Sequence, residues 1–303
     1  MLYLTIYMLK YHGISALGYV HIDRKLIGAM SLFILTALSA SLLFGIGDFI
    51  GGRASTKMPV VQVLVVGQIV GVLMYWGLAW YNNEAPMPSE LLGLALLAGI
   101  TGALGLAGLY HGIAKGYTAV TAPVSAVLAA IIPVLYGIQT EGLPSSFAMI
   151  GMGVGVVAIV LNSLAGRANG YQGLWQGVVA GVAIGIFLIL LKYIGSAGVF
   201  TPLAMARSGA LLITIPWLLI RPGGRPTGVG IGLAAVAGLL DLSANTAYML
   251  STQMGRLDIA SVLASLYPAV TVLLAFFING EKISPLQRVG LVAAIVATAL
   301  IAL

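Results

Sequence analysis

Long runs of apolar residues follow one another along the chain, separated by short polar connections. A helix needs about 20 apolar residues to cross the hydrocarbon core of a bilayer. The runs are continuous rather than alternating, so they favour membrane helices over the strands of a β-barrel. Windows of this length predict ten spanning helices, at 31–50, 60–80, 91–111, 118–138, 147–165, 175–193, 202–220, 229–250, 259–278 and 286–303.

Two segments of the chain repeat each other. The stretch "TAPVSAVLAAIIPVLYGIQTEGLPSSFAMIGMGVGVVAIVL" (121–161) aligns with "ASVLASLYPAVTVLLAFFINGEKISPLQRVGLVAAIVATAL" (260–300). Both run from an Ala/Ser-rich helix, through a glutamate at its far end, into a helix that contains glycine. Glu141 aligns with Glu281, and Gly151 aligns with Gly290 within one residue. Such self-similarity indicates an internal repeat.

The repeat divides the chain into two halves of five predicted spans, at 30–166 and 172–303. An odd number of spans in each half gives the halves opposite orientations in the membrane. Inverted repeats of this kind place a substrate site at the repeat interface, around a central cavity. We therefore predict an all-α integral membrane fold made of two inverted five-helix repeats.

Residues 1–29 fit the pattern poorly, because they are weakly hydrophobic and mixed in character. They lack a small-residue cleavage site where a signal peptide would have one. Met30 begins "MSLFILTALSASLLFG", which is typical of the N-terminus of a membrane protein. We expect residues 1–29 to be either a cytoplasmic or interfacial extension or the product of a start codon assigned too early, and the sequence slightly favours the second.

Composition agrees with a membrane location. Of the 303 residues, 60% are hydrophobic and 7% are charged, whereas soluble domains carry about 25% charged residues. The absence of cysteine excludes disulfides, thiol catalysis and cysteine metal sites. The net charge of +6 is spread over short loops, so we predict no nucleic-acid partner.

The motif "ASVLASLYPAVTVLLAFFINGEKISPLQRVGLV" resembles the signature of EamA-type carriers of the drug/metabolite transporter superfamily, and "FGIGDFIGGRAS" resembles the first span of some members. The resemblance covers about residues 30–303. It implies a ten-helix carrier with a central cavity and cytoplasmic termini, similar to bacterial exporters of amino acids and other metabolites. The halves also differ, since Leu128 aligns with Pro268, and Leu64 with Arg207.

Ionisable groups inside membrane spans usually face a cavity or a partner. Asp48 is a candidate for binding protons or cations, or for capping backbone N–H groups where neighbouring glycines disrupt the helix. Arg207 could attract a substrate carboxylate while Asp241 and Asn245, one helical turn apart, bind an amine or a proton. The alternative is a structural ion pair between Arg207 and Asp241.

Further candidates are weaker. Tyr110 and Tyr248 lie near span ends, where they could line the cavity or anchor the chain at the interface. His111 also lies near a span end, where an interfacial or helix-packing role is favoured and proton handling is the alternative. Glu141 and Glu281 lie at helix ends, where we expect them to act as polar anchors or gate contacts. Residues that could bend helices or shape the cavity are Pro133, Pro268, Gly45 and Gly47.

The predicted function is a secondary transporter in the cytoplasmic (inner) membrane that exports small metabolites, amino acids first, by alternating access. The alternatives are a multidrug or quaternary-ammonium exporter and, from other classes, an intramembrane enzyme or a channel. No nucleotide-binding motif indicates an ATPase subunit, and we expect no metal or cofactor; protons are a candidate coupling partner. Charges in the loops favour external termini, against the cytoplasmic termini that the resemblance implies.

Overall fold

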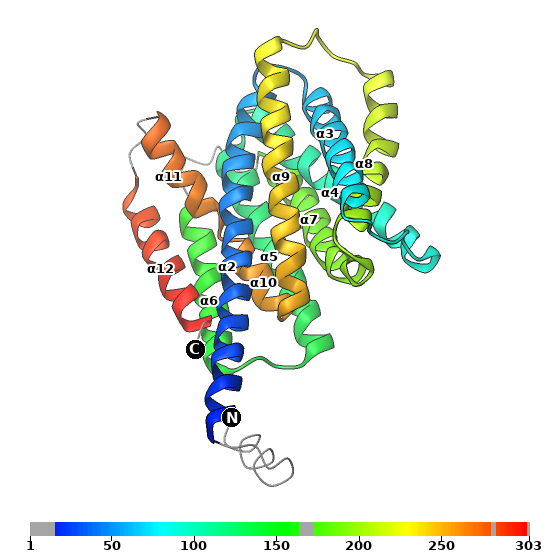
Figure 1. Ribbon diagram of the computed structural model, residues 1–303. Coiled ribbons are helices and arrows are strands. Elements are labelled where there is room, and N and C mark those ends of the chain that lie inside the picture. Colours follow the sequence, from blue (N-terminus) through cyan, green and yellow to red (C-terminus); the bar gives the residue numbers. More distant parts are fainter. Residues whose placement is uncertain (1–15, 164–171, 280–282, 302–303) are drawn as a thin grey trace.

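A computed structural model describes residues 16–163, 172–279 and 283–301, and every regular element in these ranges is helical (Figure 1). The predicted all-α class is therefore confirmed for this part of the chain. In the first half the helices are α2 (Ala16–Ser55), α3 (Val60–Tyr81), α4 (Ser89–Ala114), α5 (Thr118–Glu141) and α6 (Ser146–Ser163).

The second half contains α7 (Leu174–Ile194), a short 3₁₀ turn (Gly195–Ala197), α8 (Phe200–Ile220), α9 (Gly228–Met254), α10 (Leu257–Ala264), α11 (Tyr267–Asn279) and α12 (Pro285–Ile301). The predicted boundary at Met30 falls inside α2, which begins at Ala16. Residues 1–15 lie outside the described part.

Eight helical segments of the described chain are long and apolar enough to cross a membrane, and α10 and α11 together form one of them, Leu257–Ile278. Two of the ten predicted spans coincide with shorter apolar helices, Ser146–Asn162 and Pro285–Ile301. The structure thus describes a multi-helix membrane bundle, while the count of ten crossings stays a prediction.

The helices pack through small residues and turn their large apolar side chains outward. Gly67 on α3 and Gly238 on α9 face each other, and a Cβ at Gly67 would lie 3.6 Å from the Gly238 Cα. Trp80 and Phe277, by contrast, are 84% and 76% exposed. Close packing of small residues with an apolar exterior is typical of helices surrounded by lipid.

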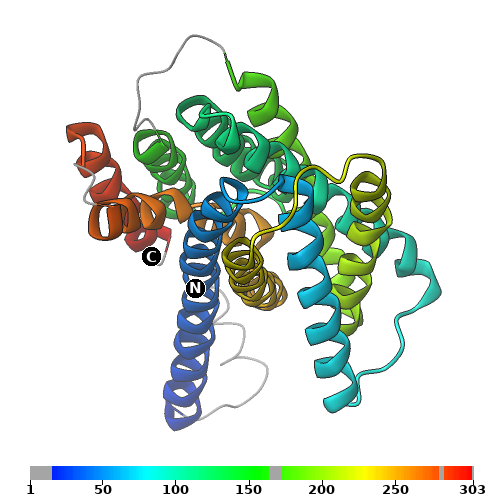
Figure 2. The same ribbon diagram turned by 90° about the horizontal axis from the view of Figure 1, so that it is seen from above.

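The longest helix, α2, runs alongside α9, and both lie in the middle of the bundle (Figures 1 and 2). Around them, α12 packs on α6, α5 packs on α7, and α4 packs on α7 and α8. This arrangement surrounds the inner parts of α2, α8 and α9, where the charged residues of the predicted spans lie.

Candidate functional site

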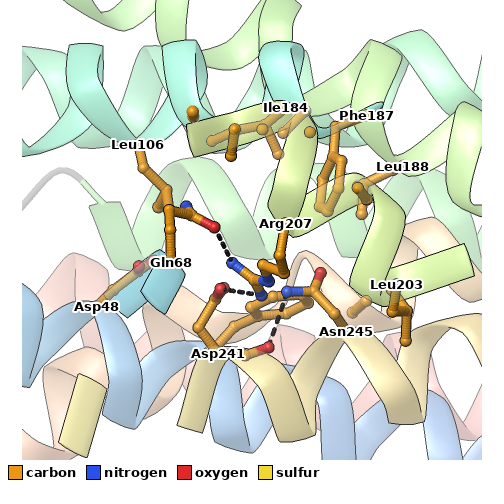
Figure 3. Close-up of a pocket in the computed structure, with 18 of the residues that line it drawn as sticks. Asp48, Gln68, Leu106, Ile184, Phe187, Leu188, Leu203, Arg207, Asp241 and Asn245 are labelled. Atoms are coloured by element: carbon orange, nitrogen blue, oxygen red, sulfur yellow. Dashed lines mark hydrogen bonds and ion pairs between the residues drawn. The ribbon is translucent and has the colours of Figure 1, made fainter. Parts of the chain in front are cut away.

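A cavity lies in the centre of the bundle, where helices of both halves meet (Figure 3). About 780 Å³ of this region is free of protein atoms, a volume that includes space open to the outside. Its polar wall includes Asp48, Gln68, Arg207, Asp241 and Asn245, from α2, α3, α8 and α9. The structure therefore brings four predicted site residues together with one glutamine that sequence analysis missed.

Arg207 lies at the centre of this polar wall and is 8% exposed. Its Nη2 donates to Asp241 Oδ2 at 2.5 Å, and its Nη1 donates to Gln68 Oε1 at 3.1 Å. The side chain passes over Gly71, where a Cβ would lie 3.0 Å from the arginine Cδ. Arg207 and Asp241 thus form the ion pair that was one of the two predicted alternatives, and Gln68 extends it to α3.

Asn245 lies one turn after Asp241 on α9 and is 1% exposed. Its Nδ2 donates to the Asp241 backbone carbonyl at 2.8 Å. Its Oδ1 is buried and has no hydrogen-bond partner among the described residues. A buried acceptor without a donor is costly, so this oxygen is suited to accept a hydrogen bond from a solute or a water molecule.

Asp48 is partly buried and reaches the same cavity from α2. The three ion pairs of the described residues use Glu141, Asp241 and Asp258, so Asp48 has no such partner there. The helix also continues unbroken past Gly45 and Gly47 to Ser55. The glycines therefore do not disrupt α2, and the hypothesis that Asp48 caps a disrupted helix finds no support in the structure.

A break between α10 and α11 forms part of the cavity wall, through Ala264, Ser265 and Tyr267. The break replaces the continuous helix predicted at 259–278. Its cause is Pro268, which has no N–H to donate to the carbonyl four residues earlier, at Ala264, where α10 ends. The predicted cavity-shaping role of Pro268 is consistent with this position.

The other candidate bending residues have different surroundings. Pro133 is buried inside α5, which runs without interruption from Thr118 to Glu141. Gly45 allows α2 to approach the broken helix, since a Cβ there would lie 2.6 Å from Val270 Cβ and 2.8 Å from the Tyr267 carbonyl oxygen. Gly47 faces α9 at Leu240 with more room, at 3.4 Å.

Three predicted site residues lie outside the wall of this cavity. Tyr248 is fully buried, and its hydroxyl contacts Ser261 Oγ at 2.7 Å and the Leu188 carbonyl at 3.3 Å. His111 is exposed near the end of α4. Tyr110 packs against Gly51 of α2 and lines a neighbouring hollow.

Two glutamates connect the halves at one end of the bundle. The carboxylate of Glu84, in the link between α3 and α4, accepts hydrogen bonds from the backbone N–H groups of Val199, Phe200 and Thr201 at the start of α8. Burial raises the pKa of Glu84, but these hydrogen bonds outweigh it and the pKa is lowered. The carboxylate therefore stays ionised at the positive end of a helix dipole.

Glu141, at the end of α5, makes the corresponding connection to α10. It pairs with Lys192 and accepts a hydrogen bond from the Leu257 N–H at 3.2 Å. Arg256 donates to the carbonyl oxygens of Glu141 and Gly142 at 3.1 and 2.5 Å. The predicted anchor role of Glu141 agrees with these contacts, whereas Glu281 lies outside the described residues.

The comparisons with known proteins include one match to a transporter family. Residues 172–303 match the EamA-like transporter family, which supports the drug/metabolite transporter superfamily. An uncharacterized protein of Methanocaldococcus jannaschii is 26% identical over 138 residues, which cover 45% of this chain and 98% of that protein. A crystal structure of a protein at 15% identity has a TM-score of 0.72 over 89% of this chain and 96% of the other.

The last likeness concerns the fold alone. Together, the apolar helices and the family match indicate a multi-pass membrane protein, and the family that residues 172–303 match is one of transporters.

Proposed function

We propose that this protein is a secondary transporter that exports small metabolites, most of all amino acids, across the cytoplasmic membrane by alternating access. The observation that carries the proposal is the central cavity between the two halves, with Asp48, Arg207 and Asp241 in its wall. Charged groups at membrane depth are costly and typically mark the path of a solute.

The pattern of helix contacts supports the proposed fold of ten spans in two inverted repeats, 30–166 and 172–303. Exchange of the halves would replace α2 by α7, α3 by α8, α4 by α9, and so on. Under this exchange, the packing of α2 on α9 becomes that of α7 on α4, and the packing of α4 on α8 becomes that of α9 on α3. Both members of each pair are observed.

The relatives support the same division of the chain. The family match covers 172–303, the second proposed repeat. The protein of Methanocaldococcus jannaschii aligns over nearly all of its own length with less than half of this chain. A single-repeat relative of a two-repeat transporter would have this length.

The polar groups of the cavity suit a solute that carries an ammonium group and a carboxylate. Asp48 has no ion-pair partner among the described residues, and the Asn245 Oδ1 has no hydrogen-bond partner there. Once the bond between Arg207 and Asp241 is broken, the Arg207 guanidinium can donate two parallel hydrogen bonds to a substrate carboxylate. The rest of the wall includes Leu106, Ile184 and other apolar side chains, so we favour neutral amino acids with apolar side chains and a proton on Asp48 as the coupling ion.

A second candidate function is export of cationic drugs or quaternary ammonium compounds. It is favoured by the pairing of Arg207 with Asp241, which leaves Asp48 in the described wall without an ion-pair partner. Phe44 and Phe187 also line the cavity, and aromatic faces attract cations.

Saturable counterflow in proteoliposomes tests both functions. The vesicles are preloaded with an unlabelled compound, and entry of the labelled form is followed for neutral amino acids, their decarboxylated amines and a quaternary ammonium cation. We expect trans-stimulated entry of an amino acid and much weaker entry of its amine. Exchange of the quaternary cation alone would favour the second function, and no exchange by folded protein would contradict both.

A further inference from the structure

A second hollow lies next to the central cavity, between α3, α4 and α9. About 300 Å³ of it is free of protein atoms, including space open to the outside, and its lining includes Leu64 and Gly67 of α3, Tyr110 of α4, and Ala234 and Ala237 of α9. Leu64 and Gly67 follow the link between α2 and α3, Ala234 and Ala237 follow the link between α8 and α9, and Tyr110 lies near the C-terminal end of α4. The hollow therefore lies between the central cavity and one end of the bundle.

The central cavity and the second hollow are separated by a layer of side chains that line both. Gln68, Leu106, Arg207 and Asp241 line both. Three of these residues form a continuous chain of hydrogen bonds from α3 through α8 to α9 (Figure 3). A solute that moves from one space to the other along this route has to part these side chains.

Helix α3 holds the layer in position through residues on one of its faces. Gln68 accepts the hydrogen bond from Arg207, and Gly71, three residues later, leaves room for the arginine stem. Tyr75, one turn further, is fully buried, and its hydroxyl donates to the Leu242 carbonyl of α9 at 2.5 Å. This bond fixes α3 against the residue that follows Asp241.

We propose that the layer of Gln68, Arg207 and Asp241 is an internal gate between two stations on the transport path, and that Gln68 positions Arg207 in the closed gate. This inference rests on the proposed transport function. A zwitterionic solute can replace both partners at once, since its carboxylate pairs with Arg207 and its ammonium group pairs with Asp241. A simple cation replaces one partner only and leaves Arg207 unpaired.

Site-directed labelling tests the gate, because the chain contains no cysteine. A single cysteine is placed in the central cavity as Ala103→Cys or in the second hollow as Ala237→Cys; Ala103 and Ala237 are 1% and 5% exposed. In proteoliposomes, a membrane-impermeant thiol reagent is added from each side in turn. The side from which Ala237→Cys reacts faster identifies the end that the second hollow faces.

From that side, Gln68→Ala should accelerate labelling of Ala103→Cys by about tenfold or more, equivalent to about 1.4 kcal/mol. Labelling of Ala237→Cys should stay within about twofold, which is less than about 0.5 kcal/mol. The matched control is Gln62→Ala, because Gln62 lies on the same helix but donates to the carbonyls of Pro222 and Gly224, outside the layer. It should leave both rates unchanged.

The double variant Arg207→Gln/Asp241→Asn removes both charges and shortens the side chain at position 207, so it should also accelerate labelling of Ala103→Cys. It replaces Gln68→Ala if that variant fails to fold. Size-exclusion chromatography and circular dichroism report folding in each case. Unchanged labelling of Ala103→Cys in folded variants would overturn the gate. Labelling needs no substrate, so an accelerated rate without counterflow would reject the proposed function and leave the gate in place.

Discussion

Asp48 and Arg207 show how two charged residues of one cavity can have different roles. Arg207 is paired on both sides, by Asp241 and Gln68, whereas Asp48 has no ion-pair partner among the described residues. An unpaired carboxylate in a membrane span is expensive unless it binds a proton, an ion or a solute. Asp48 is therefore the residue at which we expect a change of charge to affect transport most directly.

Asp48→Asn should reduce counterflow by about tenfold or more while leaving the protein folded, because the amide keeps the size of the side chain and removes its charge. The initial rate of exchange, measured against the external pH, checks this. Glu90→Gln is the control, since Glu90 is an exposed carboxylate in the first turn of α4. Equal rates for wild type and Asp48→Asn at every pH would remove Asp48 from the site.

Sequence analysis predicted four polar residues of the cavity wall because a charge or amide inside an apolar span stands out. Gln68, in "VVGQIVG", carried the same signal and was missed. The pairing of Arg207 with Asp241 could not be predicted, since it depends on how α8 and α9 face each other. Tyr248 lies outside the lining of this cavity, and a buried tyrosine bonded within the core has the same sequence pattern as one that faces a cavity.

At the scale of the helix, the main difference between the predicted and observed structure is the break between α10 and α11. Hydropathy averages over a window and does not detect a local interruption, so the span at 259–278 was predicted as continuous. The proline that causes the break was visible in the sequence, but Pro133 in α5 shows that a proline does not always divide a helix. The surroundings of the two prolines differ, because α2 approaches the segment around Pro268 closely at Gly45.

Gly45→Ala should destabilise the protein by about 1–3 kcal/mol, because the added methyl overpacks the contact with Val270 and the Tyr267 carbonyl. Gly47→Ala is the matched control on the same helix, where a Cβ would lie 3.4 Å from Leu240. It should be neutral or stabilising by up to about 1 kcal/mol, since alanine favours helix over glycine. Thermal unfolding in detergent compares the two, and equal midpoints would contradict the close approach.

The cap that Glu84 provides for α8 predicts a dependence on pH. Because its folded-state pKa is lowered from 4.5, the carboxylate contributes stability above this ordinary value. The contribution is lost as the pH falls through the lowered folded-state pKa.

Glu84→Gln should therefore cost about 1 kcal/mol at neutral pH and cost progressively less as the pH falls below 4.5. Unfolding midpoints of wild type and variant across this range test the prediction. A difference that stays constant from neutral to acid pH would show that charge plays no part in the cap.

For the whole molecule, the important feature is that the closest helix packing joins the two halves rather than helices within one half. The pairs α2 with α9, α6 with α12, α5 with α7 and α4 with α7 all cross between the halves. The similarity of 121–161 to 260–300 predicts the two halves, but it does not predict that they interlock, because similarity carries no information about contacts. Each half alone would leave most of its helix faces without a partner.

A chain divided into 1–166 and 172–303 should accordingly assemble when both fragments are produced together, and should restore counterflow. Either fragment alone should aggregate or be degraded, because its small-residue faces would pack against nothing. Co-purification of the fragments through a tag on one of them measures assembly. A monodisperse, helical first fragment on its own would show that the halves fold independently.

The pairing of Arg207 with Asp241 also has a consequence for how the protein responds to the membrane potential. A unit charge that crosses the full potential changes in energy by about 2.3 kcal/mol per 100 mV. Arg207 and Asp241 carry opposite charges in contact, so a movement of both together couples weakly to this field. Asp48, when ionised, is not compensated in this way, and a proton or cation bound to it cancels its charge. We therefore expect the membrane potential to change the rate of the transport step in which Asp48 carries no proton or cation. Exchange rates measured at two imposed diffusion potentials would test this dependence.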